Sequence, residues 1–184
     1  EICACLVGSE MCIRDRSTHN TTLPFTRLVV GAGDYTPVVF GERRLETSWT
    51  HQIATSLIFN SSVIFFGSHP QKMLENPAVK VIKEIPATWD ETIVLPSSKI
   101  GEVAAFARRS GKTWFLAVLN GQKECTIQFP LTFLDDGWYE GTVLNDNPSD
   151  AAAIAMQRVF CRNSDSLTGY MRTGGGYIVM FTPK

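Results

Sequence analysis

Four polar side chains in the first half of the sequence have types and positions that suit a binding pocket. Asp34 and Tyr35 lie in a loop of glycine, threonine and proline residues that follows an apolar run over residues 25–30. Loops at the ends of strands commonly carry functional groups, because the rigid scaffold holds them in place. Arg27, inside the apolar run, and His69, after a second apolar run, are the other two candidates.

Each of these residues also has a structural interpretation, and the sequence leaves both open. An aspartate such as Asp34 often accepts hydrogen bonds from backbone N–H groups of its own loop, and the Tyr35 ring can pack within that loop. An arginine inside an apolar strand needs an anionic or carbonyl partner if it is buried. Arg27 could therefore line a pocket or pair with such a partner inside the protein. His51 lies one residue past the apolar positions of a predicted helix and is expected to face solvent or to be capped.

The first residues of the sequence hold three of its five cysteines. Cys3, Cys5 and Cys12 could supply three thiolates, but structural zinc sites usually need four ligands in C-x2-C-like pairs. Residues 6–16 (LVGSEMCIRDR) resemble the translation of a transposase-type adapter from sequencing libraries. We therefore expect residues 1–16 to be non-native and disordered, and the gene to have been cut near Ser17, and we exclude the segment from fold prediction.

The composition of the chain excludes few functions but gives no support to two of them. The 184 residues include 17 Lys and Arg against 18 Asp and Glu, with 44% hydrophobic residues. This charge balance gives no electrostatic reason to expect nucleic acid or an anionic membrane as a partner. No apolar run reaches the roughly 18 residues needed to span a bilayer.

The predicted elements of the first half alternate between strand and helix. Apolar runs over residues 25–30 and 63–67 predict strands, and Asn76-Pro77 predicts a helix start. A helix is predicted over residues 43–59 because its apolar residues recur every four positions and form a stripe suited to covering a barrel: Leu45, Trp49, Ile53 and Leu57. This alternation is typical of β/α units. A (β/α)8 barrel needs about 250 residues, so we expect the last two units of a truncated barrel over residues 17–91.

The second half, over residues 92–184, predicts an antiparallel β-sandwich. Ser110-Gly111 is a hairpin signal between two strand-like runs. Strand-like runs cover residues 102–109, 112–120, 125–129, 138–145, 153–161, 167–172 and 177–182, with turn residues between them. Many short strands at this spacing are typical of a sandwich. The predicted fold class is therefore α/β plus all-β.

Four blocks of the sequence resemble glycoside hydrolase family 97 in the order found there, over nearly all of residues 17–184. They are HNTTLPFTRLVVGAGDYTP, IKEIPATWDET, IGEVAAFARRSGKTWFLAVLN and the closing GGGYIVMFTPK. The resemblance is to the C-terminal part of such an enzyme. Ala32-Gly33 stands where the family usually has Pro-Met, which alters the loop beside Asp34.

The resemblance implies an enzyme of carbohydrate metabolism that hydrolyses α-glycosidic bonds, as an inverting α-glucosidase or a retaining α-galactosidase acting on α-linked oligosaccharides. Tyr35 could then stack on a sugar. The resemblance also implies calcium in the active site of the intact enzyme, periplasmic or secreted localisation, and a homo-oligomer formed through the C-terminal domain. The family's catalytic carboxylates and calcium ligands lie upstream of residues 21–27. We therefore assign no catalytic residue and no metal ligand here, and we expect this chain to be inactive by itself.

One alternative function remains open from the sequence. The strand-rich half could be a stand-alone carbohydrate-binding or oligomerisation β-module with a short helical lead. Cys125 and Cys161, the cysteines outside the adapter-like segment, are expected to be small packed residues rather than nucleophiles.

Overall fold

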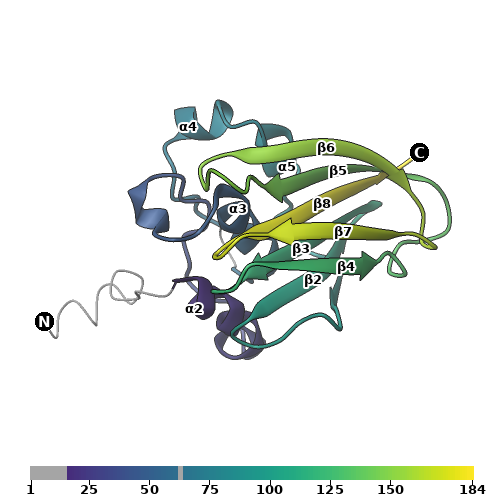
Figure 1. The fold of residues 1–184 in the computed structure, drawn as a ribbon. Helices are drawn as coiled ribbons and strands as arrows, with labels where there is room; N and C mark the ends of the chain where they lie inside the picture. The colour runs from purple at the N-terminus through teal and green to yellow at the C-terminus, as the bar shows by residue number, and fades with distance from the viewer. Residues whose placement is uncertain (1–15, 62–63) are drawn as a thin grey trace, which may run out of the picture.

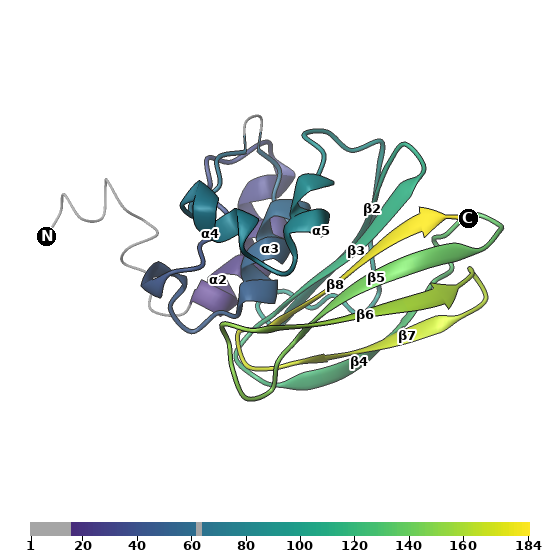
Figure 2. The same ribbon diagram turned by 90° about the horizontal axis from the view of Figure 1, so that it is seen from above.

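The described part of the chain forms three layers: short helices, a six-stranded sheet and a two-stranded sheet (Figures 1 and 2). The computed structural model describes residues 16–61 and 64–184. The helices there are α2 (Arg16–Thr22), α3 (Trp49–Ile58), α4 (Pro70–Leu74) and α5 (Val79–Lys83), with 3-10 turns at Leu23–Phe25, Arg27–Val29 and Glu42–Arg44. The strands are β1 (Glu91–Val94), β2 (Val103–Ser110), β3 (Thr113–Asn120), β4 (Cys125–Pro130), β5 (Tyr139–Asp146), β6 (Ile154–Cys161), β7 (Ser166–Met171) and β8 (Gly176–Pro183).

The described strands pair antiparallel throughout, as the sequence predicts. The larger sheet has the order β1-β2-β3-β8-β5-β6, and β4 pairs with β7 in the smaller one. Ser110 pairs with Thr113 across the predicted hairpin, and Gly111 has a φ of 59°, which glycine adopts without a steric penalty. The predicted strand-like runs coincide with β2 to β8 to within one residue at each end, and β1 is an addition to them.

The central strands β3 and β8 are buried on both faces, so the larger sheet borders two apolar cores. Phe115, Ala117, Leu119 and Ile178 face the helices, whereas Trp114, Leu116, Val118, Tyr177, Val179 and Phe181 face the two-stranded sheet. Successive side chains of a strand point to opposite faces. Burial on both faces therefore explains why these two strands read as almost continuous apolar runs.

Helix α3 packs on the larger sheet and not on a barrel. Its first turn is capped by Ser48, whose Oγ accepts a hydrogen bond from the His51 backbone N–H at 3.0 Å. Ile53 and Leu57 have no exposed surface and share a core with Phe115 of β3. The apolar stripe of the predicted helix is therefore present, and its place against a parallel barrel sheet stays a prediction.

The two predicted barrel strands do not form in the described residues. Residues 25–30 lie mostly in 3-10 turns, and Val29 and Val30 are 69% and 83% exposed. Residues 64–67 lie outside any strand, and residues 62–63 lie outside the described part of the chain. A parallel strand takes its hydrogen bonds from neighbouring strands, and the described chain places none beside these segments.

The helix predictions need smaller corrections. The helix predicted over residues 43–59 begins only at Trp49, because Leu45, with a φ of 54°, interrupts the backbone before it. Asn76 accepts a hydrogen bond from the Ala78 N–H at 2.9 Å, and α5 begins just beyond it. Helix α4, which begins after His69, is an addition to the predicted elements. The adapter-like residues 1–15 lie outside the described residues, whereas Arg16 begins α2 and is buried.

Candidate functional site

The four residues predicted for a pocket lie in separate local contacts. Asp34 is exposed. The Tyr35 hydroxyl donates to the Asn20 side-chain oxygen at 3.2 Å, and its ring meets Phe59 edge-on at 4.7 Å between centroids. Exposed Arg27 donates to the Gly31 and Ala32 carbonyl oxygens at 3.4 and 3.3 Å. His69 accepts from the Gln71 N–H at 3.2 Å and caps α4.

Tyr35, Arg27 and His69 thus have local structural partners. None of the four residues lines the pocket described next. A role for Asp34, Tyr35, Arg27 and His69 in binding a substrate therefore stays a prediction.

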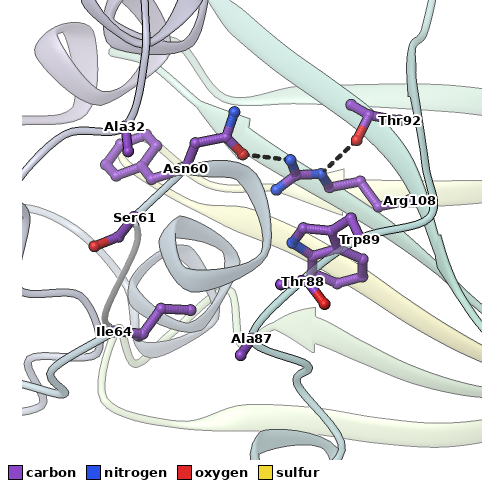
Figure 3. Close-up of a pocket in the computed structure, with 10 residues that line it drawn as sticks. Ala32, Asn60, Ser61, Ile64, Ala87, Thr88, Trp89, Thr92 and Arg108 are labelled. Atoms are coloured by element: carbon purple, nitrogen blue, oxygen red, sulfur yellow. Dashed lines mark hydrogen bonds between the residues drawn. The ribbon is translucent and has the colours of Figure 1, made fainter.

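A pocket of about 420 Å³ opens where the end of α3 meets β1 and β2 (Figure 3). Its wall comes from three segments: the loop after α3, the residues that lead into β1, and Arg108 of β2. The lining residues are Ala32, Phe59, Asn60, Ser61, Ile64, Ala87, Thr88, Trp89, Thr92 and Arg108. This lining has no carboxylate, imidazole or thiol, so its Ser and Thr hydroxyls have no general base beside them in the lining.

Arg108 is the central residue of this pocket and is only 4% exposed. Its Nη1 donates to the Leu57 carbonyl oxygen at 2.9 Å, its Nε donates to the Thr92 hydroxyl at 2.9 Å, and its Nη2 donates to the Asn60 side-chain oxygen. The guanidinium also lies 4.8 Å from the centroid of the Trp89 ring. Burial lowers the pKa of Arg108 to about 10, so the side chain stays charged at neutral pH.

The position of the Arg108 guanidinium explains its structural role. Leu57 lies in the last turn of α3, where the helix dipole and unpaired carbonyl groups favour a positive charge. Arg108 therefore connects the end of the helix to the sheet. Trp89 adds to the same junction by an edge-on contact with Phe115 at 5.5 Å between ring centroids.

The two acidic residues after Trp89 interact with the β2–β3 hairpin. The Asp90 carboxylate accepts from the Gly111 N–H at 2.7 Å, and Glu91 forms an ion pair with Arg109 at 3.1 Å. These carboxylates therefore have structural partners on one hairpin. They do not form an acid–base pair across a pocket.

A second buried polar cluster lies at the other end of α3, and the sequence analysis missed it. His51 has no exposed surface; its Nδ1 lies 2.8 Å from the Gly175 carbonyl oxygen and its Nε2 lies 2.9 Å from the Asn20 amide nitrogen. A neutral ring that donates from Nδ1 and accepts at Nε2 satisfies both contacts. Because the ring is buried, the expectation of a solvent-facing side chain was wrong. The same burial lowers the pKa of His51 to about 4.

Asp146, at the end of β5, completes this cluster. Its carboxylate accepts hydrogen bonds from the Ser48 hydroxyl at 2.6 Å, the Gly176 N–H at 2.9 Å and the Arg172 N–H at 3.1 Å. Burial raises the pKa of Asp146 to about 6 despite these donors. One side chain thus connects the start of α3 to the β7–β8 turn.

The three-glycine turn before β8 is the signal that could have revealed this cluster. A Cβ on Gly176 would lie 2.8 Å from the His51 Cα, and a Cβ on Gly174 would lie 2.8 Å from the Glu46 carbonyl oxygen. Gly174 also has a φ of +62°. Glycine is therefore required here by the close approach of α3 and of the residues just before it.

The described residues offer little to a metal or a membrane. No group of three or more His, Cys, Asp or Glu residues among them could hold a metal ion. Cys125 and Cys161 are free thiols, and burial raises the pKa of Cys161 to about 11, against a role as a reactive thiolate. Cys3, Cys5 and Cys12 lie outside the described residues. None of the helices in that part of the chain is long and apolar enough to cross a membrane.

Comparison with known proteins gives a consistent result. A family model described as "Glycosyl-hydrolase 97 C-terminal, oligomerisation" matches residues 88–182. The chain is 30% identical over 162 residues to a probable retaining alpha-galactosidase of Streptomyces bingchenggensis, covering 86% of this chain and 25% of that protein. It is 28% identical over 179 residues to a retaining alpha-galactosidase of Bacteroides thetaiotaomicron, covering 89% and 27%.

The fold is similar to that of solved enzymes. A glycoside hydrolase family 97 enzyme from Pseudoalteromonas sp. strain K8, solved in complex with acarbose, superimposes with a TM-score of 0.84 and 25% identity over 91% of this chain and 29% of that one. A beta-arabinopyranosidase superimposes with a TM-score of 0.78 and 20% identity over 95% of this chain and 29% of that one, which is a likeness of fold. The chain thus spans about a quarter of the length of the curated relatives it matches.

Proposed function

The protein belongs to glycoside hydrolase family 97, since the family model matches 95 of its 184 residues, and we propose that it serves as the non-catalytic C-terminal part of an enzyme that hydrolyses α-glycosidic bonds. In this role the β-domain and the helices docked on it support a catalytic barrel and the assembly of the enzyme. The described pocket supplies no acid–base pair.

One observation carries this proposal. The superposition on the Pseudoalteromonas enzyme covers 91% of the chain, so it includes the helices and the sheet in one arrangement. A β-module that merely shared the sandwich would match over the strands alone. The packing of the helices on the larger sheet therefore has a counterpart in that enzyme.

We propose that the substrates of the intact enzyme are α-galactosides, with retention of configuration, because both curated relatives bear that name; an inverting α-glucosidase is the second candidate. Retaining hydrolysis needs two carboxyl groups about 5–5.5 Å apart. The described pocket has none, so these groups would come from elsewhere in the enzyme. Calcium takes six to eight oxygen ligands, and the described residues do not fit such a site.

Three further features of the intact enzyme are part of the proposal. Residues 17–91 would be the C-terminal portion of a (β/α)8 barrel, with residues 92–184 as the C-terminal domain. The enzyme would work in the periplasm or outside the cell, as the family resemblance implies. It would assemble as a homo-oligomer, which the description of the family model supports.

Activity measurements test this proposal directly. The 184-residue chain should release no product from aryl α-galactosides or aryl α-glucosides, with the Bacteroides relative as positive control. The intact enzyme, expressed from the genomic reading frame, should hydrolyse one of them. Hydrolysis by this chain, or inactivity of the intact enzyme on both substrates, would contradict the proposal.

A stand-alone β-module is the alternative function. It predicts a genomic reading frame that begins close to residue 17 and a chain that binds oligosaccharides by itself. A reading frame that continues upstream with carboxylate motifs excludes it. Calorimetric titration with α-galactosides then gives the second comparison, because a non-catalytic support domain should show no heat of binding.

A further inference from the structure

We infer that two copies of this chain pack against each other through one face of β5 and β6, which we call the distal face. It consists of Glu140, Met156, Arg158, Phe160 and Lys184. The inference rests on the proposed function in one respect, namely that this domain assembles the enzyme. It adds the surface and the residues through which the two copies meet.

The distal face is the part of the larger sheet that the helices leave uncovered. Glu140 pairs with Phe160 across β5 and β6, and Thr142 pairs with Arg158, so these side chains share the face on which Leu144 contacts the helical core. Figure 2 shows the helices over one end of the sheet, while β5, β6 and β8 extend to the other end, where the C-terminus lies.

The exposed residue types of this face are those found at protein interfaces. Phe160 is 63% exposed and Met156 is 41% exposed. Single exposed apolar residues are ordinary, but here they lie on one strand with Arg158 between them. Aromatic residues, methionine and arginine are the types enriched at interfaces relative to the remaining surface.

The charges of the distal face suit a copy of itself. Glu140 lies between two cations, with its oxygens 3.4 Å from Arg158 and 3.0 Å from Lys184. The Lys184 ammonium also lies 5.1 Å from the centroid of the Phe160 ring. In a two-fold dimer the same patch faces itself. A carboxylate between two cations can then exchange partners with its counterpart while the apolar groups meet.

The choice of a second copy as the partner follows from two observations. The family model that describes an oligomerisation domain covers the whole distal face except Lys184. In addition, β6 is the last strand in the order of the larger sheet and pairs there with β5 alone. An uncovered edge strand with an apolar face is a surface that soluble proteins usually cover or pair.

Sedimentation velocity of the 184-residue chain tests the inference. We expect a reversible dimer. Phe160→Glu should raise its dissociation constant at least about thirtyfold, as removal of a central interface aromatic does. Met156→Glu should act in the same direction with a smaller effect. Phe65→Glu is the matched control, because Phe65 is 67% exposed but lies in the helical half, and it should leave the dimer unchanged.

Three results would overturn the inference: a wild-type chain that stays monomeric at every concentration, a dissociation constant that Phe160→Glu leaves unchanged, or a dimer that Phe65→Glu weakens equally. Circular dichroism should show that each variant keeps the wild-type spectrum, since all three sites are exposed. In the intact enzyme, Phe160→Glu should abolish dimerisation without abolishing hydrolysis. Loss of the proposed glycosidase function alone would thus be distinguishable from loss of this interface.

Discussion

The two faces of the six-stranded sheet are held by different chemistry. On the face towards the two-stranded sheet, the contacts are between apolar rings and aliphatic chains, such as the stack of Phe129 on Tyr177 with 5.7 Å between centroids. On the face towards the helices, His51, Arg108 and Asp146 are buried within the same layer as the apolar side chains. The first face depends on buried area, and the second also depends on hydrogen bonds and protonation.

This difference shows how a helical layer can be fixed in one orientation. Apolar contact alone is non-directional, whereas the partners of Arg108 and Asp146 fix both ends of α3. Arg108 binds the last turn of the helix, and Asp146 binds the Ser48 hydroxyl before its first turn. The helix therefore cannot slide along the sheet without leaving buried polar groups unpaired.

The largest expected effect is on the purely apolar face. Phe129→Ala should lower the free energy of unfolding by about 3–5 kcal/mol, because Phe129 is 1% exposed and its loss leaves a cavity. The loss should be nearly the same at pH 4.5 and pH 7. Urea unfolding followed by fluorescence measures it, and a strong pH dependence of the difference would contradict the assignment of this face as apolar.

The helix-facing side should respond to pH through two opposing residues. The pKa of Asp146 is raised to about 6 in the folded chain, so it contributes stability at low pH that is lost as the pH rises from about 4 to 6. The pKa of His51 is lowered to about 4, so it contributes stability at high pH that is lost as the pH falls from about 6.5 to 4. Each contribution is roughly 3 kcal/mol, and in the wild type they nearly cancel.

Single substitutions should separate the two contributions. Asp146→Asn should leave a chain whose stability falls as the pH is lowered from 6.5 to 4, because only His51 then titrates there. His51→Gln should leave a chain whose stability falls as the pH is raised from 4 to 6. Urea midpoints measured across this range test both predictions. If the stabilities of the two variants changed with pH in the same direction, Asp146 and His51 would not act in opposite directions.

A smaller loss is expected at the junction of α3 with β2. Arg108→Met should lower the free energy of unfolding by about 2–3 kcal/mol, because it leaves the Leu57 carbonyl and the Asn60 amide oxygen without their donor. Arg108→Lys keeps the charge but lacks the planar fork that reaches three partners, so it should recover only part of the loss. Full recovery by lysine would show that charge alone matters at this position.

The smallest effect is expected at an exposed ion pair. Glu91→Gln removes the contact with Arg109, whose side chain is 30% exposed, and should cost less than about 1 kcal/mol. Thermal unfolding with and without 1 M salt measures it. A larger loss of stability that salt does not reduce would show that this contact behaves as a buried interaction and not as a surface ion pair.

The strands of the second half could be predicted from the sequence, whereas the first half could not. In the β-domain, turn residues such as Gly111 bring neighbouring strands together, as in the β2–β3 and β5–β6 pairs, so local patterns locate these strands. The pairs of β4 with β7 and of β8 with β3 and β5 join strands distant in the sequence, and local patterns do not specify them. Residues 25–30 have an equally apolar pattern, but their structure depends on neighbouring strands that a single segment cannot specify. The predicted stripe at Ile53 and Leu57 was confirmed as a buried apolar pattern, whereas the sheet that it contacts in this chain could not be read from it.

The buried polar cluster was missed for a related reason. His51 and Asp146 are 95 positions apart, and only the fold brings both to the same glycine turn. The resemblance to glycoside hydrolase family 97 identified the three glycines as a shared block without saying what approaches them. Burial of Arg108 was likewise hidden, because its strand position is ordinary until α3 is placed beside it.

The burial of β3 and β8 on both faces has a consequence for how the molecule opens. Since each of these strands contributes alternate side chains to both cores, neither strand can unfold without exposing both cores. The backbone amides of Leu116 and Val179, which are paired in the middle of the sheet, should therefore exchange with solvent only through global unfolding. The helices and the two-stranded sheet thus depend on the same two strands, although their sequences suggest two domains.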